Sequence, residues 1–260
     1  TSSGTYAVIM KRDISDDNPD QLVMKDLVVV MGAPAPSAPS GPITADDVRN
    51  ITAGDLTTTD ISDSALNYII AYAIPEVNND IGIRIVEEEA TYIDEYRTND
   101  VDGSNTVFYT QNSFLWYIGD LDGDGDVDSG DVEVWLYDDA TDTRTQATVS
   151  SVDEIGKITL ASAPSSTSTV KITYMKFPLS INDPLVQKAY AELSASYAYM
   201  GLDAREKKRV SLRGFSISRD PQAAKMFYGR YLETISRINA RHAVIAKQQE
   251  ETLKKLAYLI

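Results

Sequence analysis

The sequence predicts an α+β fold: a helical domain of about four to five helices, an inserted small antiparallel β-sandwich or barrel-like domain, and an N-terminal β arm. Apolar residues recur at helical spacing in two separate regions, before residue 100 and after residue 180. Between these regions, short runs rich in β-branched and aromatic residues alternate with turn signals. Strands inserted into a loop of a helical domain are the simplest arrangement that fits this order.

The N-terminal arm comprises residues 1–42. Residues 6–10 and 27–31 are mostly apolar and predict two strands separated by a polar stretch. Residues 32–42 contain four prolines, which disfavour a regular ladder or helix and predict a linker.

Residues 43–103 are predicted to form the first part of the helical domain. Thr44 and Asp47 have the spacing of a capping box for a short helix that ends before Gly54. Ser62 starts a longer helix, which Pro75 should kink or shorten. The apolar positions of this helix are Leu66, Ile69, Ile70, Ala73 and Val77. We expect the acidic run at residues 87–89 to lie on a solvated face.

Residues 104–179 are predicted to form the inserted β-domain, with strands near 107–109, 132–136, 158–160 and 170–174. Residues 180–260 return to helix. Pro184 fits the first turn of a helix that Gly201 should end, and Pro221 starts another that runs on to about Leu256. A helix of that length must leave a compact domain or pack along a neighbour.

One motif in the β-domain indicates a metal site. Residues 120–131 have the spacing of a calcium loop, with Gly125 at the position of the sharp turn. The predicted ligands are Asp120, Asp122, Asp124, Asp126, Asp128 and Asp131. A strand follows directly, so we expect a structural Ca²⁺, or another hard cation, and not a helix–loop–helix switch. The alternative is a solvated acidic loop without an ion.

Charge is distributed unevenly along the chain. The formal net charge is −15, but residues 180–260 carry 14 Lys and Arg against 8 Asp and Glu. A basic cluster in this region could face DNA or an acidic protein, or could be a solvated turn. It consists of Lys207, Lys208, Arg209, Arg213 and Arg219. The 27 Asp outnumber the 12 Glu, which is compatible with a high-salt host as well as with a loop-rich protein.

Several functional classes are disfavoured. The chain has no cysteine, so disulfides and thiolate metal sites are excluded. His242 is the single histidine and lies on an apolar helical stripe, which argues against a histidine-dependent active site. No apolar run is long enough to span a membrane. We expect no enzymatic activity, although a hydrolase that uses a pair of carboxylates stays open as a minor alternative.

The helical regions resemble the head–tail connector (adaptor or head-completion) proteins of tailed bacteriophages and archaeal tailed viruses. Residues 43–90 resemble their opening, a short helix, a turn and a long helix; residues 183–200 and 213–245 resemble their later helices. Between them, the Asp-Gly-Asp-Gly loop, the strand at 132–137 and residues 152–164 are similar to segments of structural proteins of these viruses. The inserted β-domain and the arm depart from the minimal all-helical connector.

This resemblance implies a structural virion protein that forms a ring, dodecameric in the family, beneath the portal. The ring would extend the channel for packaged DNA and carry the next neck or tail-completion protein. It would be assembled in the host cytoplasm and reside in the neck of the virion. The C-terminal segment would dock on the portal through Leu253, Leu256, Tyr258, Leu259 and Ile260.

A second interpretation is a calcium-stabilised module that binds glycans or a cell surface. Such a module needs an exposed aromatic platform. The candidates for that platform are Trp116, Tyr117 and Trp135.

Overall fold

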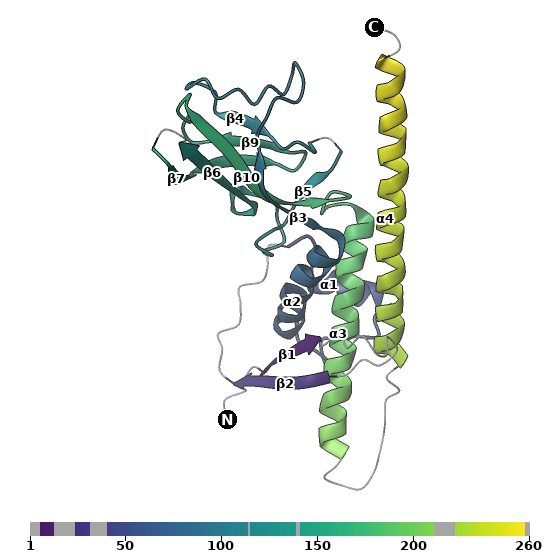
Figure 1. Ribbon diagram of the computed structural model, residues 1–260. Helices are drawn as coiled ribbons and strands as arrows, with labels where there is room; N and C mark the ends of the chain where they lie inside the picture. Colours follow the sequence, from purple (N-terminus) through teal and green to yellow (C-terminus); the bar gives the residue numbers. More distant parts are fainter. Residues whose placement is uncertain are drawn as a thin grey trace.

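The computed structural model describes residues 6–12, 24–31, 41–113, 115–138, 141–210 and 222–257, with side-chain surroundings for residues 41–202 and 222–248 within these ranges. Figure 1 shows a group of helices, a β-domain beside its upper part and a separate hairpin near its lower end. Helices and antiparallel sheets both contribute to the described chain, so the predicted α+β class is confirmed.

The described chain contains four α-helices: α1 (Ala45–Ile51), α2 (Asp63–Ile81), α3 (Pro184–Val210) and α4 (Gln222–Ala257). The predicted start of α1 is confirmed, because Thr44 and Asp47 form a reciprocal capping box. Ser62 caps α2 by accepting a hydrogen bond from the backbone N–H of Ala65 at 3.3 Å. Pro75 lies inside α2, which continues to Ile81.

Helices α3 and α4 run antiparallel and are staggered along their common axis (Figure 1). The small residues Ala195 and Ala198 of α3 and the large residues Phe227, Tyr231 and Ile238 of α4 are buried in the same core, and the ring of Tyr199 stacks on that of Phe227. The prediction that Gly201 ends this helix is wrong, since α3 continues to Val210. The residues after Gly201 are strong helix formers, and they outweigh the cost of about 1 kcal/mol that glycine adds within a helix. Among the described residues, no helix combines the length and hydropathy needed to cross a membrane.

Tyrosine hydroxyls connect the helices. Tyr231 of α4 donates a hydrogen bond to Asp80 of α2 at 2.5 Å, and Tyr197 of α3 donates one to Glu76 of α2. The phenol rings are buried or partly buried in the helical core while their hydroxyls reach carboxylates at its edge. Burial raises the pKa of both tyrosines well above the ordinary range, so each hydroxyl keeps its proton and acts as a donor.

The β-domain consists of two antiparallel sheets. One contains β3 (Ile83–Glu89), β10 (Ser168–Phe177), β6 (Val132–Asp138) and β7 (Thr143–Ala147) in that order, with β5 (Tyr117–Gly119) also paired to β10. The other contains β4 (Val107–Tyr109), β9 (Lys157–Leu160) and β8 (Val149–Asp153) in that order. Buried side chains from both sheets, among them Phe108, Ile158, Val134 and Ile172, form one core.

The predicted boundary between the first helices and the β-domain is wrong. Residues 83–89 form β3, which pairs with β10 and so belongs to the β-domain. The acidic run, expected on a solvated face, is only partly solvated: Glu89 is exposed, whereas Glu87 and Glu88 are half-buried. Glu88 accepts hydrogen bonds from the backbone N–H of Gln111 at 2.8 Å and from the hydroxyl of Tyr174 at 3.1 Å. Glu87 pairs with Arg144 at 2.8 Å at an irregularity in the ladder, where its φ is +52°.

At the N-terminus, β1 (Tyr6–Arg12) and β2 (Met24–Met31) pair antiparallel, with Val8 opposite Val29. These strands lie where the arm was expected to have them. The turn between them and most of the proline-rich linker lie outside the described residues. A two-stranded hairpin is marginally stable alone in water, and β1 contacts α2 of the same chain.

Candidate metal centre

The predicted calcium loop, residues 120–131, lies where the β-domain meets the helices. It joins β5 to a 3₁₀ turn (Ser129–Asp131) that leads directly into β6. Asn78 of α2 donates hydrogen bonds from Nδ2 to the backbone carbonyl of Asp120 at 3.0 Å and to its carboxylate at 3.1 Å. The loop therefore connects two parts of the molecule, in addition to connecting two strands.

Two glycines allow the loop to turn and to pack closely. Gly123 has φ +80° and Gly125 has φ +92°, a region that side chains rarely adopt. A Cβ on Gly125 would lie 2.5 Å from the Cα of Gly41, and one on Gly123 would lie 2.9 Å from Cγ of Pro75. The sharp turn expected at Gly125 is therefore present, and the turn rests against the helical part of the chain.

The carboxylate of Asp120 organises the first half of the loop. It is buried and accepts hydrogen bonds from the backbone N–H groups of Gly123 at 2.7 Å, Asp124 at 3.1 Å and Gly125 at 2.8 Å. Charge-assisted hydrogen bonds of this kind hold a carboxylate in one orientation. The backbone is thus wrapped around the side chain at position one of the predicted loop.

Three of the six predicted ligands converge. Carboxylate oxygens of Asp120, Asp122 and Asp124 all lie within 4.8 Å of one another. Two carboxylates about 4 Å apart repel by about 1 kcal/mol in water and about 4 kcal/mol at an intermediate dielectric. A hard cation between them removes this repulsion. Calcium takes six to eight oxygens, so this group could supply only part of its coordination shell.

The other three predicted ligands are not in that group. Asp131 is buried and accepts hydrogen bonds from the backbone N–H of Leu121 at 2.5 Å and of Asp128 at 2.7 Å. Asp128 caps the 3₁₀ turn by accepting from Gly130 at 2.6 Å, and Asp126 accepts from Val127 at 2.9 Å. In this geometry these carboxylates shape the loop, and the structure does not bring them to the same point as the first three.

Burial changes the acidity of the two enclosed carboxyls. Desolvation raises the pKa of Asp120 to about 6 and that of Asp131 to about 7, although the backbone N–H groups around them act in the opposite direction. Two buried carboxyls with raised pKa values, next to exposed Asp122 and Asp124, form an environment that favours either protons or a cation.

The sequence did not predict that α2 and α3 hold Asp120 of the calcium loop in place through hydrogen bonds. The hydroxyl of Tyr190 donates a hydrogen bond to Oδ1 of Asn78 at 2.6 Å, and Asn78 in turn holds Asp120. Asn78 is buried next to Val77 on the apolar stripe of α2. A polar residue on such a stripe is the one sequence signal that could have identified this link.

The two predicted docking sites, the basic cluster and the C-terminal segment, are described only in part. Arg213 and Arg219 of the basic cluster, and Tyr258, Leu259 and Ile260 of the docking segment, lie outside the described residues. Lys207, Lys208 and Arg209 belong to the last turns of α3, and Leu253 and Leu256 to the last turns of α4; of these five, only the backbone is described.

The aromatic residues considered for glycan binding are engaged by the protein itself. The ring of Trp116 lies 3.9 Å from that of His242 in α4, and Lys176 lies 4.5 Å from the centre of the same indole. Trp135 is covered by the guanidinium of Arg144 at 3.8 Å. Tyr117 is partly buried against the helical core. All three candidate rings are half-buried, and both indoles contact other side chains of the protein, so none of them forms a freely exposed platform.

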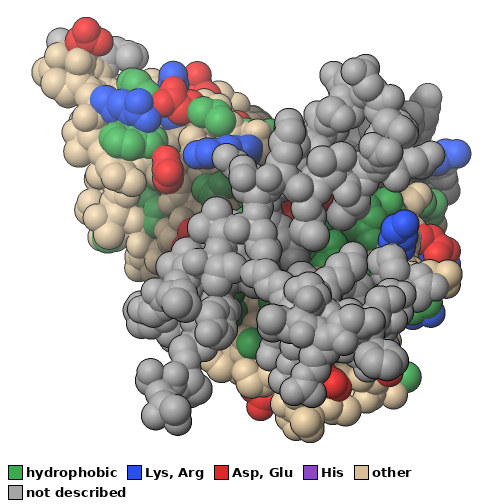
Figure 2. Space-filling model, turned by 90° about the horizontal axis from the view of Figure 1, so that it is seen from below, with side chains coloured by type: hydrophobic (Ala, Val, Ile, Leu, Met, Phe, Trp, Pro, Cys, Tyr) green, Lys and Arg blue, Asp and Glu red, His purple; other side chains and the backbone are tan. Residues whose placement is uncertain are grey.

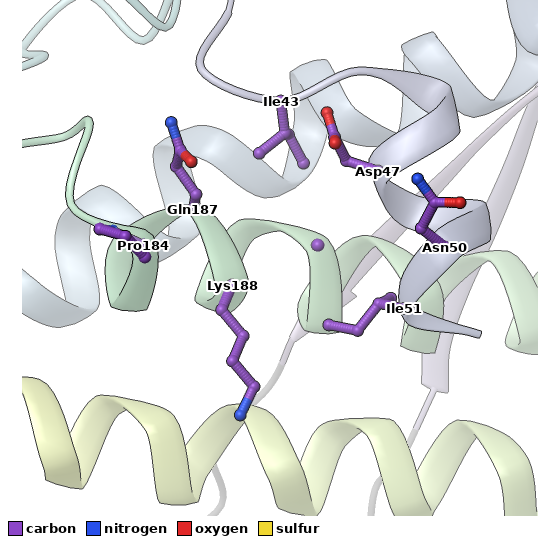
Figure 3. Close-up of a pocket in the computed structure, with 8 residues that line it drawn as sticks. Ile43, Asp47, Asn50, Ile51, Pro184, Gln187 and Lys188 are labelled. Atoms are coloured by element: carbon purple, nitrogen blue, oxygen red, sulfur yellow. The ribbon is translucent and has the colours of Figure 1, made fainter. Parts of the chain in front are cut away.

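A cleft of about 280 Å³ lies between α1 and the start of α3, and Figure 3 shows the residues that line it. Its charged lining residues are Asp47 and Lys188. Asp47 is occupied by the cap of α1, because it accepts hydrogen bonds from the N–H and the hydroxyl of Thr44, both at 2.7 Å. Lys188 points toward α4 and lies 3.6 Å from Glu192 (Figure 3). None of the predicted site residues lines this cleft.

Comparison with known proteins adds no relative: no family model matches the chain, and no curated protein or solved structure is significantly similar to it.

Proposed function

We propose that this chain is a structural component of a tailed virus, a ring-forming head–tail connector whose β-domain is fastened to its helices by a bound cation. The observation that carries this proposal is the stagger of α3 and α4. With 27 and 36 residues they are about 40 and 54 Å long, and each extends past the other (Figure 1). Helix ends that extend in this way gain stability by packing along a neighbouring molecule.

The order of the elements supports the same proposal. A short capped helix, a turn and a long helix come first, and two long helices come last, as in the family that the sequence resembles. The β-domain is inserted between them through two short connections, one at Gly82 and one after Phe177. In the proposed ring, the helices form the wall, and the C-terminal end of α4 contacts the portal.

The proposed cation has a structural role. The loop joins Asp120, held by Asn78 of α2, to the start of β6, so an ion there fixes the β-domain relative to the helical domain. Asp120, Asp122 and Asp124 would hold the ion, and the ion would cancel their mutual repulsion. This role needs no bond breaking and no open coordination position.

The test of the proposed function is the mass of the purified full chain, measured by sedimentation or native mass spectrometry with calcium present. The proposal predicts a closed oligomer of one defined copy number, which binds a portal ring when the two are mixed. A chain that remains monomeric at all concentrations and does not bind a portal would contradict it.

A further inference from the structure

The connection between β3 and β4 contains no regular strand but is held to the β-domain by side-chain hydrogen bonds. Asn99 is buried and donates from Nδ2 to the backbone carbonyls of Thr91 and Tyr109, both at 2.9 Å, while its Oδ1 accepts from the N–H of Tyr109 at 2.7 Å. Arg97 ion-pairs with Asp94 and donates to the carbonyl of Ser113 at 3.0 Å. These side chains replace the missing ladder and fix the loop on the sandwich.

This loop presents two tyrosines to solvent. Tyr92 is 64% exposed and Tyr96 is 82% exposed. Residues 91–102, here called the tyrosine loop, contain four Asp and Glu against one Arg, a net charge of −3. A pre-ordered loop with exposed tyrosines loses little conformational entropy on binding, which is why such residues are common in binding surfaces.

A complementary surface lies on α4. Met226, Arg230, Arg237, Val244 and Lys247 are exposed and follow one another at intervals of three, four or seven residues, so they share one face of the helix, here called the α4 stripe. Met226 is 45% exposed and Val244 is 56% exposed. Residues 222–248 carry five Lys and Arg against Glu233 alone, a net charge of +4. The α4 stripe therefore carries the apolar Met226 and Val244 and the cationic Arg230, Arg237 and Lys247, while Glu233, which pairs with Arg237, lies on the same face and leaves the face net positive.

The α4 stripe points away from the β-domain of its own chain. That β-domain contacts α4 through Trp116 and His242, with ring centroids 3.9 Å apart. His242 lies two residues before Val244, so it is rotated by about 200° around the helix and faces the opposite side. The tyrosine loop of the same chain is therefore poorly placed to cover the stripe.

We propose that the tyrosine loop of one copy docks on the α4 stripe of a second copy. This inference rests on the proposed ring and names the surfaces that form it. Glu95, Asp100 and Asp102 are exposed and face a positive stripe, and tyrosine rings stack well on arginine guanidinium groups and aliphatic side chains. Since the two surfaces differ, the contact is heterologous and propagates from copy to copy until a ring closes.

Two full-chain variants test this contact by sedimentation at low salt. Tyr92→Ser with Tyr96→Ser removes the loop's aromatic groups. Arg230→Glu with Lys247→Glu reverses part of the stripe and leaves the Arg237–Glu233 and Arg241–Asp183 pairs intact. Each variant is expected to weaken self-association by about tenfold or more. The control, Val86→Ser, removes a side chain of 66% exposure outside both surfaces and should assemble like the unmodified chain. Circular dichroism checks that every variant is folded.

Mixing the two variants gives the sharper result. Each keeps one intact surface, so one loop variant and one stripe variant should form a heterodimer that cannot extend into a ring. If the unmodified chain assembles and both variants assemble equally well, the proposed contact between the tyrosine loop and the α4 stripe is wrong, but the proposed ring is not contradicted. An unmodified chain that stays monomeric overturns both proposals. Variants that lose assembly but form no heterodimer on mixing also overturn the contact.

Discussion

Asn78 is the residue through which the helices hold the metal loop. It is buried, it donates to Asp120, and it accepts from Tyr190, so a single amide connects α2, α3 and the loop. Buried polar networks stabilise a fold only when every member has a partner, because an unsatisfied buried group retains its full desolvation cost.

We therefore expect Asn78→Ala to lower the free energy of unfolding by about 1–3 kcal/mol, since the carboxylate of Asp120 and the hydroxyl of Tyr190 both lose a partner. Urea denaturation measures this change. The matched control is Asn79→Ala at the neighbouring exposed position, which should be nearly neutral. Equal effects at both positions would show that the link is unimportant.

The raised pKa values of Asp120 and Asp131 predict that, without calcium, these two carboxyls stabilise the folded protein at low pH, which is the opposite of the usual effect of carboxylates. Both pKa values, about 6 and about 7, lie above the ordinary value of 3.8, so without divalent cations the folded protein binds protons more tightly than the unfolded chain. In the absence of divalent cations, these two groups therefore add to the free energy of unfolding. Their contribution is fully present below about pH 4 and is lost as the pH rises through 6 to 7. With calcium bound, the carboxylates must be ionised, and acid should destabilise the protein instead.

The measurement is urea denaturation at about pH 5 and about pH 8, in chelator and in calcium. We expect calcium to stabilise the protein much more at the higher pH, because protons compete with the ion at the lower pH. The same calcium effect at both pH values would contradict this assignment.

At the scale of elements, the calcium loop (residues 120–131) has two neighbours, the β-domain and α2. Sequence reasoning predicts that chelation destabilises residues 104–178 and spares the helices. Because Gly123 approaches Pro75 and Asp120 binds Asn78, the structure extends the expected effect to α2. Hydrogen exchange in calcium and in chelator should show faster exchange in β5, β6 and the second half of α2.

The control for chelation is Asp122→Asn with Asp124→Asn, which keeps the side-chain shape and removes two converging charges. This variant should melt at the same temperature with and without calcium, whereas the unmodified chain should gain stability when calcium is added. If calcium changes the melting temperature of neither protein, the calcium loop does not bind calcium.

Trp116 and His242 form a second joint, between the β-domain and α4. We expect Trp116→Ala to destabilise this contact by about 1 kcal/mol or more and to increase hydrogen exchange in α4 around residues 238–245. Trp135→Ala is the comparison, because Trp135 lies in the same domain but contacts Arg144 and not α4. Unchanged exchange in α4 after Trp116→Ala would show that the joint does not restrain the helix.

Elements with strong local signals were predictable from the sequence. The capping box at Thr44, the cap at Ser62 and the helix start at Pro184 depend on neighbouring residues alone, and the structure has them at those positions. β3 was missed because IRIVEEE combines a short apolar alternation with an acidic run, and only pairing with β10 makes it a strand. The end of α3 was missed because helix formers after Gly201 outweigh one glycine.

The candidate site was predictable in part. The turn at Gly125 and the convergence of Asp120, Asp122 and Asp124 follow from sequence spacing. The orientation of Asp131 depends on backbone N–H groups on both sides of the loop, and the support from Asn78 comes from a residue 42 positions away. Spacing within a motif contains no information about such contacts.

At the scale of the whole molecule, the proposed assembly depends on the distribution of charged and hydrophobic side chains over the surface. On the part of the face that Figure 2 shows in colour, basic, acidic and hydrophobic side chains lie interspersed. Exposed hydrophobic side chains are distributed over the tyrosine loop, β3 and α4. Opposite net charges on the tyrosine loop and on α4 favour contact between copies and oppose symmetric contacts of like surfaces.

The most direct test of the connector proposal is imaging of the chain in its native assembly by electron cryomicroscopy. The proposal predicts a ring with rotational symmetry around a channel at the neck of the virion, with helices in the wall, the β-domains outside and the end of α4 against the portal. Particles in which this chain forms no ring, or lies away from the neck, would contradict it.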